Sequence, residues 1–180
     1  PSASRPSRVM TVDATSFQRL VDDVPAGSTL YFPATANYYW FSTTRIQINK
    51  AITIRCENWN AELRWNVTTL SDPGGDDRAV LNIRHDTNGS TLSGIRIEGC
   101  KFNFGGARTP CTNAEGRRGL NITRANDVVL QNNWFERGVG EMVGLNNFGT
   151  PTSERYWVLH NVFTNFCTSG QALNTNATRT

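Results

Sequence analysis

The chain has 180 residues, a formal net charge of +3 and 18% charged residues. It has no lysine and arginine cluster of the kind that marks a nucleic-acid surface, and no apolar run approaches the roughly 20 residues of a membrane span. We therefore expect one domain with its own core, and neither a nucleic acid nor a membrane as its partner.

The first residues predict an arm followed by a helix. Residues 1–11 are rich in Ser, Pro and Arg, which is typical of a mobile arm, and we expect residues 12–180 to form a single domain. Thr15 and Gln18 have the spacing of a capping box, which predicts a helix over Ser16–Val24. One face of that helix is apolar, so we expect it to cap one end of the domain.

Aromatic residues come next. Leu30–Pro33 predicts a strand that ends in a turn, and Tyr38–Phe41 predicts a strongly aromatic strand. Its rings either fill the first layer of the core or form an exposed platform for a sugar ring. The candidate glycan-binding residues are Tyr38, Tyr39, Trp40 and, further along the chain, Trp157.

A frame then recurs along the chain. In Leu130–Phe135 an aromatic residue follows an aliphatic one after five positions, and the same frame returns in Ile54–Trp59, Ile97–Phe102 and Val158–Phe163. Two short alternating apolar runs precede the aromatic residue of each copy, which indicates strands. Such repetition is typical of a solenoid, and the unequal spacing of the copies favours β-coils over helical repeats.

We therefore predict an all-β fold with four coils of a parallel β-helix behind the short helix. In this arrangement Trp59, Phe102, Phe135 and Phe163 form one interior column. The many Asn residues suit the corners between strands, because Asn tolerates left-handed backbone and its amide can bridge coils. An antiparallel sandwich with similar-looking strands is the alternative.

The stretches AGSTLYFPA and RIQINKAITIRC, which come after the predicted helix, resemble the opening of the pectate-lyase-like superfamily of right-handed parallel β-helix proteins. That superfamily includes polysaccharide lyases, polysaccharide hydrolases and phage tailspikes, and the resemblance is closest to a tailspike-like member. It implies a right-handed β-helix and extends from Val12 to about Phe163. It says little about activity.

The four cysteines leave several arrangements open. They show no CxxC spacing, so we expect no zinc site. Cys56 and Cys100 occupy neighbouring positions of adjacent coils, while Cys111 and Cys167 lie in predicted loops that leave the same corner. Either pair could form a disulfide, and Cys56 and Cys100 could instead be small buried core residues.

Catalytic residues are hard to find. Lyases and hydrolases that resemble this chain use acidic residues on outward strand positions, but here those positions carry no carboxylate pair. We therefore expect no metal and no cofactor. The remaining candidates are Glu136, Arg137 and Glu141, which we place on a loop after Phe135, and surface ion pairs are the plainer interpretation of that loop.

The C-terminal end predicts an uncovered coil. A further strand begins at Ala172–Leu173, and no closing helix follows it. A coil left open at this end would expose apolar side chains. We therefore expect that the chain is truncated here and belongs to a longer parent chain, or that a partner subunit or a trimer-like association covers this end.

These patterns favour a non-enzymatic surface or virion protein of the phage-tailspike or capsid-decoration type, used for attachment, assembly or glycan contact. Its partners would be other virion or cell-surface subunits, in a homotrimer or on a particle, and a polysaccharide. Its location would be extracellular or on the virion surface. The alternative is a polysaccharide lyase or glycoside hydrolase whose site is completed by another chain segment or subunit. A third interpretation is a purely structural cell-surface solenoid that disulfides stabilise.

Overall fold

The computed structural model describes residues 14–34, 38–41, 45–65, 79–85, 90–105, 118–138, 140–146, 155–165 and 171–175. Most of these residues lie in β-strands, and one short α-helix, α1 (Ala14–Asp23), precedes the strands. The predicted all-β class with a short N-terminal helix is therefore confirmed. No helix among the described residues is long and apolar enough to cross a membrane. The predicted arm lies outside the described residues.

The described strands form three parallel five-stranded sheets and one parallel two-stranded sheet. Sheet A contains β1 (Thr29–Phe32), β4 (Thr53–Cys56), β8 (Arg96–Glu98), β12 (Val128–Gln131) and β15 (Tyr156–Leu159). Sheet B contains β2 (Tyr39–Trp40), β5 (Glu62–Arg64), β9 (Lys101–Asn103), β13 (Trp134–Glu136) and β16 (Val162–Thr164). Sheet C contains β3 (Ile46–Ile48), β6 (Ala79–Arg84), β10 (Arg118–Thr123), β14 (Glu141–Asn146) and β17 (Gln171–Thr175). The small sheet pairs β7 (Leu92–Ser93) with β11 (Ala125–Asn126).

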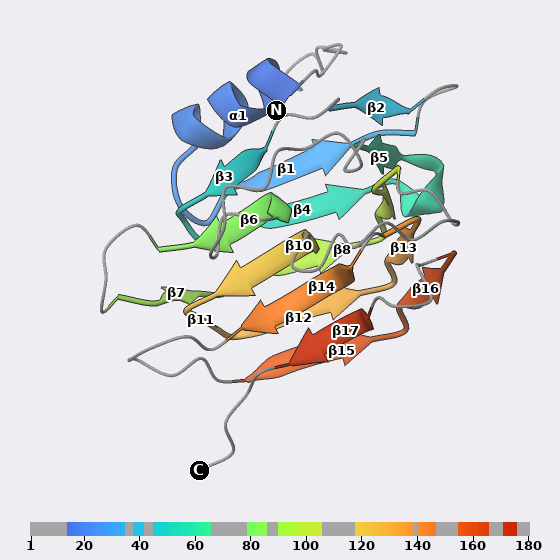
Figure 1. Cartoon of the computed structure of the whole chain (residues 1–180). Helices are drawn as coiled ribbons and strands as arrows, with labels where there is room; N and C mark the ends of the chain where they lie inside the picture. Colours follow the sequence, from blue (N-terminus) through green and yellow to red (C-terminus); the bar gives the residue numbers. More distant parts are fainter. Residues whose placement is uncertain are drawn as a thin grey trace.

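The chain visits sheets A, B and C in a fixed rotation, and we call each passage through the three sheets a round. Each strand pairs in parallel with its counterpart in the previous round, as in β4 with β8 and β8 with β12. Figure 1 shows the rounds stacked from α1 at one end to β15 and β17 at the other. The described strands make up five rounds against the four coils predicted, because β1 and β2 precede the first copy of the frame and β17 follows the last. These parallel pairings contradict the antiparallel sandwich.

The predicted pairs of aliphatic residues lie in register. In sheet C, Ile46 is level with Leu81, Leu120 and Val143, and in sheet A, Ile54 is level with Ile97, Leu130 and Val158. All of these side chains are buried except Val158, which is half-buried. Because like residues lie above like residues, the repeat builds one continuous hydrophobic core between the sheets.

Three of the four rings predicted to form a column do so. The rings of Phe102, Phe135 and Phe163 stack in sheet B with centroid separations of 5.1 Å and 5.2 Å. The prediction for Trp59 is wrong, because Leu63 occupies its place in register with Phe102. Trp59 lies instead in a 3-10 helix, η1 (Asn58–Asn60), and is 42% exposed.

Helix α1 covers the edge of the first round. Phe17 and Val21 are fully buried, and the Phe17 ring lies 5.3 Å from the ring of Phe32. Gln18 does not complete a capping box as predicted. Its side chain donates to the backbone oxygen of Gln47 at 2.9 Å and accepts the Gln47 N–H at 2.8 Å. Gln18 therefore imitates a neighbouring strand at the edge of β3, which protects that edge from pairing with another chain.

Left-handed residues turn the chain at the corners between strands. Eight described residues other than glycine have positive φ angles, among them Asn58, Asn132 and His160 at the corner between sheets A and B. Asparagine amides bridge the rounds beside this corner. The amide of Asn133 donates to the Ile97 oxygen at 2.9 Å and accepts the Cys100 N–H at 3.0 Å. The expected corner role of asparagine is therefore confirmed.

The outer side of sheet C carries polar residues that are buried. Gln47, Asn82 and Asn121 share one register position on the side of the sheet opposite to the aliphatic pairs. Asn82 and Asn121 are nevertheless fully buried, and Asn121 donates to Asn82 at 2.9 Å while Asn82 donates to Gln47 at 3.1 Å. This amide ladder satisfies polar groups that would otherwise be costly to bury.

Candidate functional site

Charged and amide side chains gather on the outer face of sheet B. Leu63, Phe102 and Phe135 point into the core, so the residues on either side of each point outward. The register sets these outward residues beside one another across three strands. We call five of them the polar ladder: Glu62, Arg64, Lys101, Asn103 and Glu136.

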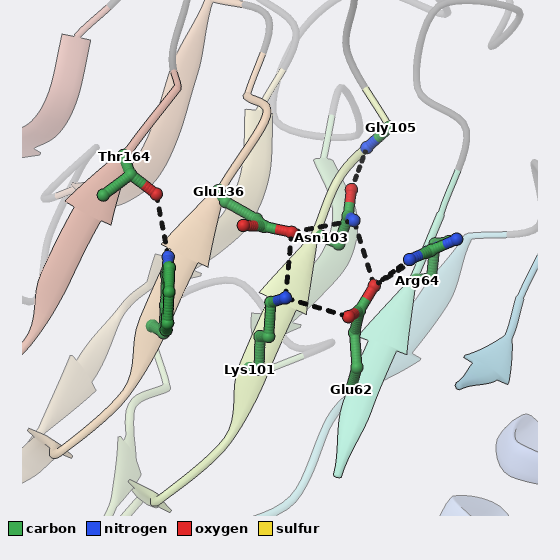
Figure 2. Close-up of polar contacts among 8 residues, drawn as sticks. Glu62, Arg64, Lys101, Asn103, Gly105, Glu136 and Thr164 are labelled. Carbon is green, nitrogen blue, oxygen red and sulfur yellow. Dashed lines mark hydrogen bonds and ion pairs between the residues drawn. The ribbon is translucent and has the colours of Figure 1, made fainter. Parts of the chain in front are cut away.

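The polar ladder is one connected network, shown in Figure 2. The Lys101 Nζ lies 3.0 Å from Glu62 and 3.2 Å from Glu136. The Asn103 amide donates to the same two carboxylates at 3.0 Å and 2.9 Å. Arg64 completes the network with an ion pair of 2.6 Å to Glu62. One lysine and one amide thus hold two glutamates together on the outer face of the sheet.

The network changes the pKa values of its members. Burial acts to raise the pKa of Glu62, but hydrogen bonds from Lys101, Arg64 and Asn103 outweigh burial and lower it. Burial acts to lower the pKa of Lys101, but its hydrogen bond to Glu62 and that carboxylate's charge raise it. Both groups therefore stay charged over a wide range around neutral pH.

These shifts predict how stability depends on pH. Because the pKa of Glu62 is lower in the folded chain than its ordinary 4.5, its contribution is complete above that value and is lost as the pH falls through the folded pKa. Lys101 has a raised pKa, so its contribution is complete below its ordinary 10.5 and is lost as the pH rises through the folded pKa. We expect Lys101→Met to destabilise the fold by about 2 kcal/mol at pH 7. This loss should become smaller as the pH falls through the folded pKa of Glu62, because Lys101 then loses a charged partner.

Urea denaturation at a series of pH values would measure this effect. Arg19→Met is a matched control, because Arg19 is paired with Asp23 on the open surface of α1, where both side chains are mostly exposed. Equal losses of stability in the two variants, or a Lys101→Met loss that does not become smaller at any pH down to the acid limit of the folded state, would contradict the prediction.

Two exposed aromatic residues flank the polar ladder on the side of the first round. Tyr38 and Trp40 are each 44% exposed, and their ring centroids lie 6.0 Å apart. The Arg64 guanidinium lies 3.7 Å from the centre of the Tyr38 ring, which fixes that ring against the ladder. These rings form an exposed aromatic surface next to hydrogen-bonding groups.

A groove lies at the corner between sheets A and B, and we call it the corner groove. It has a volume of about 560 Å³, within the usual range for small-molecule sites. It is lined by Arg55, Cys56, Asn58, Trp59, Asn60, Glu98, Gly99 and Asn132. These residues belong to β4, η1, the end of β8 and the turn after β12, so three rounds contribute to it.

Several polar groups in the corner groove are available to a ligand. Glu98 accepts hydrogen bonds from Arg55 and Arg96, whose guanidinium groups outweigh burial and lower the pKa of Glu98. Within the described part of the chain, the side-chain amides of Asn58, Asn60 and Asn132 have no hydrogen-bond partner. The groove therefore offers three amides beside a charged pair.

The Trp59 indole connects the corner groove with the polar ladder. Its N–H donates to the Asn132 oxygen at 2.7 Å, and its ring meets the Trp134 ring edge-on at 5.4 Å. The Trp134 ring in turn lies 5.1 Å from the Lys101 Nζ. Groove and ladder thus form one continuous surface in which aromatic faces alternate with hydrogen-bonding groups.

The predicted glycan-binding residues fall in different places. Tyr38 and Trp40 lie together on the outer face of sheet B. Tyr39 points into the core and is only 7% exposed, so the interpretation of Tyr39 as a platform residue is wrong. Trp157 is 43% exposed but lies on β15 in sheet A, away from the strands that carry Tyr38 and Trp40.

The predicted catalytic residues are also separated. Glu136 and Glu141 lie in β13 and β14 rather than on a loop, because the turn between these strands is short. Glu136 belongs to the polar ladder, whereas Glu141 belongs to sheet C and forms an ion pair with Arg118. Arg137 lies at the corner between them in a left-handed conformation, with its side chain exposed.

A disulfide joins Cys56 and Cys100, whose Cα atoms lie 4.8 Å apart. Cys111 and Cys167 lie outside the described residues. Within the described part of the chain, no group of three or more His, Cys, Asp or Glu side chains could hold a metal ion.

Glu62, Lys101 and Asn103 were not predicted from the sequence, and Trp59 was assigned to the core. A signal for the ladder was present, since a polar residue directly follows each inward phenylalanine, Asn103 after Phe102 and Glu136 after Phe135. The residues inserted around η1 obscured it in the second round. No protein-family model, no curated protein and no solved structure matches the chain.

Proposed function

We propose that the protein is a non-enzymatic surface or virion protein whose right-handed parallel β-helix contacts glycans. The rotation of the chain through sheets A, B and C, with each round pairing in parallel with the next, supports this architecture. In this proposal the protein acts in attachment or assembly outside the cell or on a virion. Its partners are other virion or cell-surface subunits in a homotrimer or on a particle. A disulfide between rounds suits an oxidising environment.

The observation that carries the glycan contact is the corner groove with the exposed Trp59. Sugars present apolar ring faces and many hydroxyl groups, so they bind where an aromatic face lies beside hydrogen-bonding side chains. The groove combines the Trp59 indole with the side-chain amides of Asn58, Asn60 and Asn132. Tyr38 and Trp40 extend the same kind of surface across sheet B.

We expect Trp59→Ala to weaken glycan binding by at least about tenfold, which corresponds to about 1.4 kcal/mol. A glycan array would first identify a ligand of the unmodified protein, and isothermal titration calorimetry would then compare the variants. Trp157→Ala is a matched control, because Trp157 is equally exposed but lies away from the groove. The proposal fails if the protein binds no glycan, or if both variants lose affinity equally.

A glycoside hydrolase is the second candidate, and one observation favours it. Glu62 and Glu136 both accept hydrogen bonds from the Asn103 amide nitrogen, so the accepting oxygens lie at most about 6 Å apart, a separation that suits a pair of catalytic carboxyls. The lowered pKa of Glu62 argues against it as a proton donor, since a general acid needs a raised pKa.

Assays for the release of reducing ends from bound polysaccharides would decide between the two candidates. Hydrolysis that disappears in both Glu62→Gln and Glu136→Gln, but persists in Glu141→Gln, would establish the hydrolase. Binding without hydrolysis supports the non-enzymatic protein.

A further inference from the structure

One wall of the corner groove is a short segment whose side chains are not buried in the core. Asn58, Trp59 and Asn60 form η1, and none of them is buried. Glu57, which precedes η1, makes no side-chain hydrogen bond to cap it. Because apolar burial contributes little here, the position of η1 depends on the contacts at and around its ends.

Those contacts include backbone hydrogen bonds from the Glu57 N–H to the Phe32 oxygen and from the Lys101 N–H to the Ala61 oxygen, and the Cys56–Cys100 disulfide is the covalent one. Cys56 immediately precedes Glu57 and η1, and its partner belongs to the next round. On the far side of the groove, the Trp59 indole donates to the Asn132 oxygen. Gly99 lies beneath, where an added Cβ would lie only 3.0 Å from the Cys56 oxygen. The disulfide therefore joins the base of the η1 wall to the floor of the groove.

The same corner is bridged differently in later rounds. Asn133 of the fourth round bonds back to Ile97 of the third, and Asn161 of the fifth bonds back to Leu130 of the fourth. The register of Lys101 with Trp134 puts Cys100 at the corresponding position of the third round. Cys100 likewise reaches back by one round, to Cys56. At the corner that carries the groove, a disulfide thus takes the place of the amide bridge.

A reductant does not act on an amide bridge, whereas it can open a disulfide. Resting on the proposed function, we propose that the Cys56–Cys100 disulfide positions η1 for glycan binding, so that reduction of this disulfide switches off the corner groove. A dithiol reductant supplies two electrons and two protons. The S–S bond breaks, Cys56 and Cys100 become thiols, and the dithiol becomes a cyclic disulfide.

Reduction leaves the strands in place. The second and third rounds remain paired through β4 with β8, β5 with β9 and β6 with β10. Cys100 is fully buried and Cys56 lines the groove, so a reductant approaches the disulfide through the groove itself. A bound glycan therefore slows reduction, because it covers that approach. It also makes the disulfide harder to reduce at equilibrium, by the same factor by which reduction weakens glycan binding.

Hydrogen exchange and glycan titration, each with and without dithiothreitol, test the proposal. After reduction we expect exchange at the amides of residues 57–61 to rise by about tenfold or more, while β4 and β8 stay protected. Affinity for the glycan found on the array should fall by at least about tenfold. Cys56→Ala/Cys100→Ala should show both effects without reductant, and Cys111→Ser/Cys167→Ser should still respond to dithiothreitol.

Three results would overturn the proposal. One is unchanged exchange at residues 57–61 after mass measurement shows complete reduction. Another is unchanged glycan affinity under the same conditions. The third is exchange that rises equally in β4 and β8, since the disulfide would then hold the fold rather than the groove. If the double alanine variant does not fold, the variant Cys56→Ala/Cys100→Asn is measured in its place. Asn at position 100 supplies the side-chain amide that Asn133 and Asn161 supply in the later rounds. If the oxidised protein binds no glycan, the proposed function fails, and exchange at residues 57–61 still decides whether the disulfide positions the groove wall.

Discussion

Asn133→Ala is expected to destabilise the fold by about 3 kcal/mol, because two buried backbone groups lose their partners. The Asn133 side chain is fully buried, and it satisfies both the Cys100 N–H and the Ile97 carbonyl. Alanine offers neither group a hydrogen bond. Chemical denaturation monitored by circular dichroism would measure the loss.

Two other asparagines provide graded controls. Asn161 makes the corresponding bond to the Leu130 oxygen but is only half-buried, so Asn161→Ala should cost less than Asn133→Ala. Asn60 is exposed on η1, and its replacement should change the free energy of unfolding by less than about 0.5 kcal/mol. Equal costs at Asn133 and Asn60 would show that the amide bridge between rounds contributes nothing to stability.

Gly119→Ala should destabilise the fold by about 2 to 3 kcal/mol through overpacking. Gly119 lies in β10 and is buried, and an added Cβ would lie 2.3 Å from two ring carbons of Phe104. The Phe104 ring cannot withdraw easily, because it packs between Trp65 and Phe102. The methyl group therefore forces a shift in the core.

A double-mutant cycle tests the cause of this loss. Phe104→Ala alone should cost about 3 to 5 kcal/mol, and in that background Gly119→Ala should be nearly neutral. Gly138 is the matched control, because its added Cβ would lie equally close, at 2.3 Å, to the Cγ of Met142, whose unbranched side chain adapts more easily than a ring. We expect Gly138→Ala to cost less than about 1 kcal/mol. Additive losses at Gly119 and Phe104 would contradict the overpacking explanation.

The sequence predicts the aliphatic core well, because alternation within each strand and repetition between strands point to the same residues. Ile54, Ile97 and Leu130 could be aligned without coordinates. Trp59 could not be placed in this way. The inward residue of sheet B, Leu63, lies nine positions after Ile54, whereas Phe102 lies five positions after Ile97. The insertion that forms η1 therefore moved an aromatic residue from the predicted core to the surface.

The candidate site was harder to predict, because its members meet only through the register of three strands. Glu62, Lys101 and Glu136 are far apart in the sequence and individually look like ordinary surface charges. The corner groove depends on a local insertion, and no repeat pattern reveals where an insertion packs. Tyr38 and Trp40 point outward because Tyr39 between them points inward, but four consecutive aromatic residues show no alternation from which this could be predicted.

The disulfide also determines how the protein responds to mechanical load. Hydrogen bonds between rounds run along the axis of the stack, so a pulling force applied to the two ends would peel rounds away one after another. The cross-link between Cys56 and Cys100, which are 44 positions apart, keeps the intervening segment from adding to the extended length. A thiol reductant would release that hidden length, and the segment between Cys56 and Cys100 could then unravel like the rest.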